Sequence, residues 1–334
     1  MIKKPKLAVM LIFVMSLLII AYCFINQKGT KEEDASVQVT HKKVVLGFSQ
    51  IGDESAWRTA NTLSVMSAAK EAGIEVLFSN AEQKQENQIK AIRSFIAQQV
   101  DIIVFSPIVE TGWDEVLQEA KISGIPVIIL DRAIQTKDEN LYAAYIGTDL
   151  LEEGRKAGRW LVEKCKNSKD AISVVEIKGT TNSAPTILRS NGFRESIKAD
   201  TNIRIIESEN GDFMRSKGKE VMERVLQSQR GKIDVVYAHN DDMALGAIEA
   251  IEEYGLKPGK DIMIVSVDAV KAAFQAMIAG KLNCSVECNP LQGPQLMKTV
   301  LDLVNGKAVP RKIVIEEGIF TQETAAKELP NRKY

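Results

Sequence analysis

This sequence of 334 residues contains few cysteines and histidines and carries little net charge. Its four cysteines are too few for a disulfide scaffold. Cys284 and Cys288 lie in a β-like run, where four residues place the Cα atoms ~13 Å apart, beyond disulfide reach unless the chain turns back. No Cys/His spacing resembles a zinc site. A formal net charge of −1 argues against the basic surface that nucleic acids attract. We therefore expect neither a metal site nor a nucleic-acid partner.

Motifs of cofactor and nucleophile chemistry are also missing. The sequence contains no phosphate-binding loop, no dinucleotide glycine motif and no G-x-S-x-G elbow. An apolar segment stands where a repressor would carry a helix-turn-helix. A glycosidase that uses Asp131 and Asp268 stays open as an alternative, and it would require these carboxylates at glycosidase separations. The sequence favours a protein that is not an enzyme and needs no cofactor.

One long hydrophobic run is present, at the start. Lys3, Lys4 and Lys6 precede an uncharged run, Leu7–Ile25, which has the ~20 residues needed to cross a bilayer. This pattern is typical of an export signal. Three outcomes stay open: cleavage, lipid attachment at Cys23 as in a bacterial lipoprotein, or an uncleaved anchor. Residues 26–42 are polar and lack periodicity, so we interpret 1–43 as a signal or anchor segment with a tether. We expect an extracytoplasmic body, periplasmic or attached to the outer face of the cell membrane through this segment only.

The stretch Val44–Asn61 sets the pattern for the rest of the chain. An apolar strand is followed by a polar loop and then by a helix that we predict over Thr59–Ala72. Loops at the carboxyl ends of parallel strands bind ligands in α/β sheets. This loop offers Glu54 as an acceptor, Trp57 as a flat apolar face and Arg58 as a donor.

Strands and helices then alternate through two similar halves. The four buried runs with the clearest strand pattern are Ile102–Phe105, Pro126–Leu130, Val235–Ala238 and Ile262–Val267. We expect a final strand over Ile313–Ile319. Such alternation predicts parallel sheets covered by helices on both faces, in two doubly wound lobes with a cleft between them.

Several segments resemble one family. They are GFSQIGDESAWR, QKQENQIKAIRSFIAQQVD, PVIILDR, GDFMRSKGKEVME, YAHNDDMALGAI and LKPGKDI. Together they are similar to the type I sugar-binding proteins of bacterial ABC importers, most of all the galactofuranose-binding branch and more distantly the ribose-binding proteins. The resemblance extends from Val44 to about Phe320.

This resemblance implies the periplasmic binding protein-like I fold, with a three-segment hinge near Thr148-Asp149, Glu287–Pro290 and Lys307–Arg311. It divides the chain into an N-terminal lobe (44–148 and about 289–308), a C-terminal lobe (149–288 and about 309–322) and a polar tail (323–334). The implied ligand-binding residues, taken in chain order, are Glu54, Trp57, Arg58, Asp131, Arg132, Arg189, Phe213, Asn240, Asp268 and Glu287. Cys288 stands where ribose-type relatives have a glutamine.

Each of these residues has a structural alternative. Trp57 could pack in the core, and Asp131 with Arg132 could form an ion pair. Glu54 could serve only as an acidic residue at a helix start. Asn240 and Asp241 compete for one helix N-cap, and we assign Asp241 to the cap and Asn240 to the ligand.

The sequence thus predicts an extracytoplasmic protein that binds a monosaccharide between two closing lobes and delivers it to an ABC transporter permease. The alternative is a membrane-anchored sugar sensor that presents the bound sugar to a histidine kinase.

Overall fold

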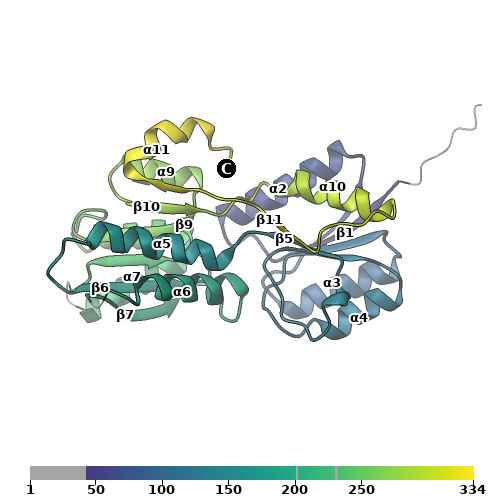
Figure 1. Ribbon diagram of the computed structural model, residues 1–334, viewed down its shortest axis with the longest axis horizontal. Coiled ribbons are helices and arrows are strands. Elements are labelled where there is room, and N and C mark those ends of the chain that lie inside the picture. Colours follow the sequence, from purple (N-terminus) through teal and green to yellow (C-terminus); the bar gives the residue numbers. More distant parts are fainter. Residues whose placement is uncertain (1–42, 201, 230–231) are drawn as a thin grey trace, which may run out of the picture. The chain divides into compact units, whose positions relative to one another are not determined.

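The computed structural model describes residues 43–200, 202–229 and 232–334. The predicted signal or anchor run, Cys23 and most of the tether lie outside the described residues. Within the described ranges, no helix combines the length and the apolar character needed to cross a membrane. Residues Lys43–Tyr334 form one compact unit, in which the strands form two separate sheets (Figure 1).

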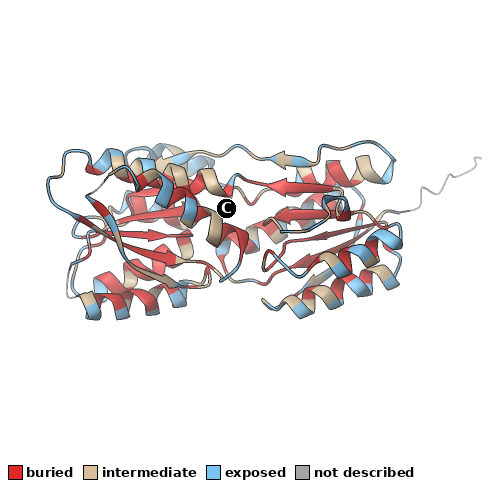
Figure 2. Cartoon of the chain, turned by 60° about the horizontal axis from the view of Figure 1, so that its bottom comes forward, coloured by how far each residue is buried: buried red, intermediate tan, exposed pale blue. Residues whose placement is uncertain are grey.

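The first sheet contains six strands, all parallel, in the order β11-β5-β4-β3-β1-β2. Its strands are β1 (Val45–Gln50), β2 (Glu75–Asn80), β3 (Ile102–Phe105), β4 (Val127–Asp131), β5 (Ala144–Gly147) and β11 (Lys312–Val314). The central strands β3 and β4 are buried along their whole length, and Figure 2 shows buried strands within the sheets. This burial explains their continuous apolar runs, because helices cover both faces of the sheet.

Two pairs of helices cover this first sheet. The elements are α2 (Ala56–Glu71), α3 (Gln85–Ala97), α4 (Asp114–Ile122), α10 (Gly293–Val304) and the 3-10 turn η1 (Glu139–Leu141). Helices α2 and α10 pack together over one face, where Leu296 and Val300 join Leu46 and Phe48 in a core cluster. Helices α3 and α4 cover the other face. Glycine is required at position 293, because a Cβ there would meet the Ser64 carbonyl oxygen at 2.1 Å.

The second sheet also has six strands, in the order β12-β10-β9-β8-β6-β7. Its strands are β6 (Ile172–Lys178), β7 (Ile203–Asn210), β8 (Val235–Ala238), β9 (Met263–Asp268), β10 (Cys284–Glu287) and β12 (Ile319–Thr321). All neighbours are parallel except β12, which runs antiparallel to β10.

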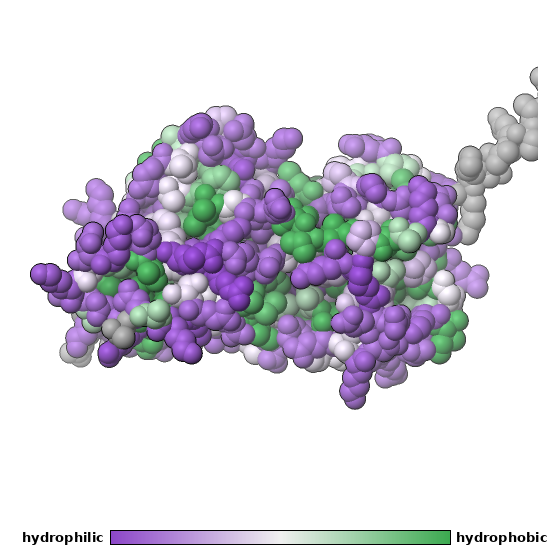
Figure 3. All heavy atoms as spheres, viewed as in Figure 1, coloured by the Kyte–Doolittle hydropathy of each residue, from purple (hydrophilic) through white to green (hydrophobic). Residues whose placement is uncertain are grey.

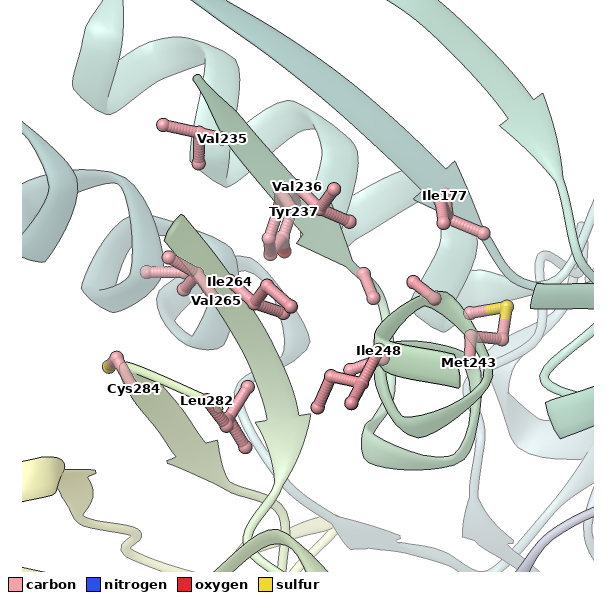
Figure 4. Close-up of a cluster of buried hydrophobic side chains, with 14 of the residues drawn as sticks. Ile177, Val235, Val236, Tyr237, Met243, Ile248, Ile264, Val265, Leu282 and Cys284 are labelled. Atoms are coloured by element: carbon pink, nitrogen blue, oxygen red, sulfur yellow. The ribbon is translucent and has the colours of Figure 1, made fainter. Parts of the chain in front are cut away.

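Helices also pack in groups around the second sheet. The helical elements are α5 (Leu150–Cys165), α6 (Ala184–Ile197), α7 (Arg215–Gln229), α8 (Asp241–Glu253), α9 (Lys271–Ile278), α11 (Gln322–Glu328) and η2 (Leu329–Asn331). Helix α5 packs on α6, α7 on α8, and α9 on both α8 and α11. Figure 4 shows the core of this sheet, where Met243 and Ile248 of α8 lie among side chains of β8 and β9. The predicted fold class, two doubly wound lobes, is confirmed.

The chain passes between the sheets three times, and the predicted position of the last crossing is wrong. The first crossing joins β5 to α5, and the second joins β10 to α10. We expected the third near Lys307–Arg311 and one strand over Ile313–Ile319. Instead β11 pairs with β5 in the first sheet and β12 pairs with β10 in the second. The third crossing is therefore Ile315–Gly318, and the expected strand is divided between the lobes.

The C-terminal residues 323–334 do not form the expected polar tail. Helix α11 buries Ala325 completely and packs on α9. The backbone N–H of Lys271 donates to the carbonyl oxygen of Tyr334 at 2.7 Å. The guanidinium of Arg332 lies over the rings of Phe274 and Phe320. These residues therefore belong to the second lobe.

The exterior of the molecule is mostly polar. On the face in Figure 3, hydrophilic residues predominate and hydrophobic residues form separate patches. The described cysteines, Cys165, Cys284 and Cys288, are all free. The expectation that Cys284 and Cys288 do not pair is confirmed.

Candidate functional site

A small cavity lies where the carboxyl ends of strands from both sheets face each other. Its lining residues are Glu54, Ser55, Trp57, Arg58, Asp131, Arg132, Pro185, Arg189, Phe213, Asn240, Asp268 and Cys288. Every predicted ligand residue except Glu287 is among them. The cavity volume is about 20 Å³, enough for about one water molecule. A larger ligand could enter only when the two lobes separate.

The first wall is built around Arg58, which lies in the first turn of α2 because that helix begins at Ala56, earlier than predicted. Ser55 caps the helix by accepting a hydrogen bond from the N–H of Arg58 at 3.1 Å. The Arg58 side chain donates to Glu54 at 3.0 Å and to Asp131 at 2.8 Å, and all three groups are buried. Burial raises the pKa of Glu54, but Arg58 and Arg132 outweigh it and hold that pKa below its ordinary value. Glu54 is therefore an ionised acceptor at neutral pH.

Arg132 belongs to the same wall but has much weaker protein partners. Its shortest separations from carboxylates are 3.7 Å to Glu54 and 3.9 Å to Asp131. Nη1 donates to the Ile108 carbonyl oxygen at 3.4 Å, and Nε has no hydrogen-bond partner among the described residues. Burial and the neighbouring Arg58 lower the pKa of Arg132 to about 10. Arg132 is thus a buried cation that retains unused hydrogen-bonding capacity.

The second wall contains Arg189 and Asp268. Arg189 of α6 donates from Nε to Glu153 at 2.6 Å and from Nη1 to the carbonyl oxygen of His239 at 2.6 Å. Its Nη2 lies 3.8 Å from Asp268, at the end of β9. Burial raises the pKa of Asp268 well above its ordinary value, and Arg189 offsets this only in part. Asp268 therefore holds a proton more readily than an exposed aspartate does.

Phe213 completes the second wall from the loop before α7. Its backbone has a positive φ of 63°, and its ring occupies the space beside Gly179, where an added Cβ would lie 1.9 Å from the ring. The guanidinium of Arg132 lies over the same ring, 4.9 Å from its centroid, so the two walls meet here. Gly179 is required for this placement of the ring.

The assignment of the α8 cap to Asp241 is wrong. Asn240 is the N-cap, and its side chain accepts from the Met243 N–H at 3.0 Å and donates to the Phe213 carbonyl oxygen at 3.1 Å. Asp241 is fully buried and accepts hydrogen bonds from the hydroxyls of Ser266 and Ser285 and from the Val270 N–H. Asn240 thus caps the helix and also lines the cavity, where it stays a candidate ligand contact.

Trp57 contacts both lobes. It lies in the first turn of α2, yet it packs in the core cluster of the second lobe, and its Nε1 donates to the Cys288 carbonyl oxygen at 2.6 Å. Two further bonds join the lobes: the Ala56 N–H to Asp242 at 2.8 Å, and the Glu110 N–H to the Asn182 carbonyl oxygen at 3.0 Å. The lobes are therefore closed on each other in this structure.

Glu287 lies outside the cavity, contrary to prediction. Its carboxylate accepts from Arg332 at 2.7 Å, from the Tyr334 hydroxyl at 3.1 Å and from the Gly318 N–H at 3.0 Å. The neighbouring Cys288 lines the cavity instead, since successive residues of a strand point to opposite sides.

Beside Cys288, a group of side chains joins the crossings, in which Glu153 and Cys288 are buried and Glu317 is half-buried. Among the described residues, Glu153, Cys288 and Glu317 bring their ligand-type atoms within 4.8 Å of one another. Glu153 accepts from Thr148 at 2.7 Å and from Arg189 at 2.6 Å, so both its oxygens have protein partners. The positive charge of Arg189 also opposes a second cation here. We assign no metal to this group.

Three cavity residues were not predicted from the sequence as ligand contacts: Ser55, Pro185 and Cys288. Ser55 is the N-cap of α2 and Pro185 lies in the first turn of α6. Because both residue types are common at helix starts, the sequence contains no separate sign that they line the cavity. For Cys288 there was a signal, because it stands where ribose-type relatives have a glutamine.

The cavity therefore offers buried charged donors and acceptors beside two aromatic rings. Glu54 Oε2, Arg58 Nη1 and Arg132 Nε are buried and have no hydrogen-bond partner within the described residues. Charge-assisted hydrogen bonds of this kind suit the hydroxyl groups of a small polar ring, and the faces of Trp57 and Phe213 suit its C–H edges.

Comparisons with known proteins agree with this geometry. A family model described as "periplasmic binding protein domain" matches residues 46–308. The galactofuranose-binding protein of Escherichia coli strain K12 is 46% identical over 293 residues, which cover 87% of this chain and 92% of that protein.

Two solved structures are similarly close. A Mycobacterium smegmatis protein in complex with β-D-fucofuranose has 52% identity and a TM-score of 0.86, covering 87% of this chain and 95% of that one. The binding protein of the arabinose ABC transporter from Shewanella sp. ANA-3, bound to L-arabinofuranose, has 46% identity and a TM-score of 0.84. It covers 87% of this chain and 96% of its own.

Proposed function

Because this chain belongs to the periplasmic binding protein family, we propose that it captures an aldose in the furanose form, galactofuranose first, and delivers it to an ABC importer. Family members act outside the cytoplasm, and the relatives described above bind sugars. The three buried polar atoms without protein partners, Glu54 Oε2, Arg58 Nη1 and Arg132 Nε, are the observation that carries this proposal. An acceptor and two donors at one wall match vicinal hydroxyls, each of which both donates and accepts.

Binding requires a change in the separation of the lobes. A cavity of about 20 Å³ is far too small for a sugar, so the ligand enters an open form and the lobes close over it. The sugar contacts both walls only in the closed form, and it therefore favours that form. We propose that the importer permease recognises the closed form. The protein itself performs no catalysis in this proposal.

Thermal melting with a panel of sugars tests the proposal. A true ligand at 100 times its Kd should stabilise the folded protein by ~2.7 kcal/mol, which for a protein of this size raises Tm by several degrees. The panel contains galactofuranose, L-arabinose, fucose, galactose, ribose and glucose. Absence of a shift with every sugar would refute sugar binding.

Small-angle scattering tests the closure. The radius of gyration should fall when the sugar that gives the largest melting shift is added. A shift in Tm without compaction would refute the closing mechanism while leaving sugar binding in place.

The N-terminal segment determines how the protein is attached to the membrane. We propose that residues 1–43 attach it to the outer face of the membrane, by lipid at Cys23 or as an uncleaved anchor. Mass spectrometry of the mature N-terminus distinguishes these forms from a cleaved one. Co-purification of the sugar-loaded protein with a permease supports import, whereas co-purification with a histidine kinase supports the sensor alternative.

A further inference from the structure

A second cavity lies between the lobes, beside the first crossing. Its volume is about 280 Å³, compared with about 20 Å³ for the cavity described above. Exposed residues form its rim (Glu139, Asp149 and Lys312), and buried residues form its floor (Tyr145 and Leu150). An apolar cavity of ~150 Å³ holds a benzene molecule. The second cavity therefore has room for a small organic molecule in the closed form of the protein.

The walls of this second cavity come from both lobes. The first lobe contributes Ala133 and Ile134, from the loop after β4, and Tyr142, just before β5. The second lobe contributes Leu150, the first residue of α5, and Leu188 of α6. A molecule that fills the cavity therefore contacts both lobes in the closed arrangement. Such a molecule binds the closed form better than the open form and shifts the equilibrium toward it.

The second cavity adjoins the first. In two pairs of chain neighbours, Arg132-Ala133 and Leu188-Arg189, the arginine lines the first cavity and the apolar residue lines the second. Tyr145, on the floor of the second cavity, donates its hydroxyl hydrogen to the carbonyl oxygen of Asp131 at 2.9 Å, and Asp131 lines the first cavity. The same chain segments thus contribute to both cavities.

Arg311 gives the second cavity a cation without a counterion. Its guanidinium lies over the ring of Tyr142, 4.1 Å from the centroid, and Nη1 donates to the Tyr142 carbonyl oxygen at 2.5 Å. Nη2 is buried without a hydrogen-bond partner, and Arg311 forms no ion pair within the part of the chain that the structure describes. A guanidinium keeps its charge, and a buried donor without an acceptor is costly. An anionic oxygen in the cavity would supply the missing acceptor.

The rest of the cavity restricts the kind of anion. Small-molecule sites are mostly apolar, with a few polar groups that orient the ligand, and most of the other lining residues here are aliphatic or aromatic. At the rim, the charge of Lys312 is opposed by the carboxylates of Glu139 and Asp149, and Asp149 also accepts from the Glu152 N–H as the cap of α5. A ligand with several negative charges would be repelled at this rim. The lining fits one carboxylate at Arg311 and an apolar body.

We propose that the second cavity binds a small monocarboxylate with an apolar body, paired with Arg311, and that this binding tightens capture of the sugar. The coupling is reciprocal, so the sugar raises the affinity for the carboxylate by the same factor. The inference rests on the proposed function only for the identity of the sugar.

Benzoate is the probe for the second cavity, and benzyl alcohol is its neutral counterpart of similar size. Their affinities for the full-length chain are measured by calorimetry and saturation-transfer NMR, with and without galactofuranose. Arg311→Met removes the cation but keeps an apolar side chain, and Ala133→Phe fills the cavity from a half-buried loop position. Arg93→Met removes an exposed arginine that pairs with surface glutamates and serves as the control.

We expect benzoate to bind the parent and Arg93→Met equally, and benzyl alcohol to bind at least about tenfold more weakly, because it lacks the charge-assisted hydrogen bond. Arg311→Met should bind both probes alike, and Ala133→Phe should bind neither. A parent that binds no benzoate, with or without sugar, would overturn the site whether or not the variants fold. Undiminished benzoate binding by Arg311→Met would overturn the assignment of the anion to Arg311.

The coupling is tested by titrating galactofuranose into the benzoate-saturated parent. The sugar affinity should rise at least about fivefold, and Arg311→Met should show no such rise. Benzoate alone should also reduce the radius of gyration in small-angle scattering, because it favours the closed form. An unchanged sugar affinity, or no compaction by benzoate, contradicts the coupling. Failure of galactofuranose to bind contradicts the proposed function instead, and benzoate binding and compaction without sugar still decide on the second cavity.

Discussion

Two neighbouring arginines of the cavity should respond in opposite ways to the same substitution. Arg58 is the hydrogen-bonded partner of two buried carboxylates, Glu54 at 3.0 Å and Asp131 at 2.8 Å. Arg132 approaches the same carboxylates only at 3.7 and 3.9 Å. Arg58 therefore stabilises the folded first lobe, whereas Arg132 keeps its hydrogen-bonding capacity for a ligand.

The expected magnitudes follow from these contacts. Arg58→Met leaves two buried carboxylates without their partner, which should cost about 3–5 kcal/mol of unfolding free energy. Arg132→Met keeps most of the apolar volume and relieves the repulsion with Arg58, so it should cost less than ~1 kcal/mol. The sugar, however, loses a charge-assisted hydrogen bond worth ~1.5–3 kcal/mol, which weakens binding by about 10- to 150-fold.

The assay is denaturant unfolding of the sugar-free proteins, paired with calorimetry of sugar binding. Arg93→Met is the control, because Arg93 is exposed and pairs with surface glutamates. Exposed ion pairs contribute little to stability, so this variant should unfold and bind sugar as the parent does. Two results would refute the reasoning: Arg132→Met that is as unstable as Arg58→Met, or Arg132→Met that binds sugar with the affinity of the parent.

Other predictions concern residues whose assignment the structure changed. Asp241→Ala should cost about 3 kcal/mol or more of unfolding free energy, because the buried donors around it lose their acceptor; denaturant unfolding measures this, and a cost below ~1 kcal/mol would contradict it. Asn240→Ala should cost ~1 kcal/mol of stability as a lost helix cap and also weaken sugar binding; a cost in stability alone would place Asn240 outside the ligand site. Glu287→Gln should change the sugar affinity by at most about twofold, or ~0.4 kcal/mol, because Glu287 lies outside the cavity. A larger loss of affinity in calorimetry would return this residue to the site. A protein that begins at Val37 should fold and bind as the full chain does, and loss of binding with the fold intact would show that the N-terminal segment does more than attach it.

The order of strands and helices could be predicted from the sequence because both carry strong periodic patterns. Buried parallel strands such as β3 and β4 are continuous apolar runs, and glycines end several helices. The division of Ile313–Ile319 into β11 and β12 could not be predicted in this way. Both pieces have strand character, and only pairing with β5 or with β10 decides which sheet each one joins.

The candidate site was predictable where a polar residue directly follows a buried strand. Asp131 and Asp268 end β4 and β9, and both have positive φ angles that turn the chain at the cavity. Glu287 follows the same pattern at the end of β10, yet it faces Arg332. The side to which a strand end points depends on register, and a register shift of one residue exchanges Glu287 for Cys288.

The return of the chain to the first lobe has a consequence for biogenesis. Helix α10 covers one face of the first sheet and β11 completes its edge, so this lobe lacks a full core until the end of the chain has been made. About 240 residues separate β1 from α10, and their synthesis takes ~12–50 s at ordinary translation rates. A protein that acts outside the cytoplasm must first cross a membrane. During that interval the emerging chain has no finished N-terminal lobe, and we expect the late crossings to help keep the nascent protein competent for export.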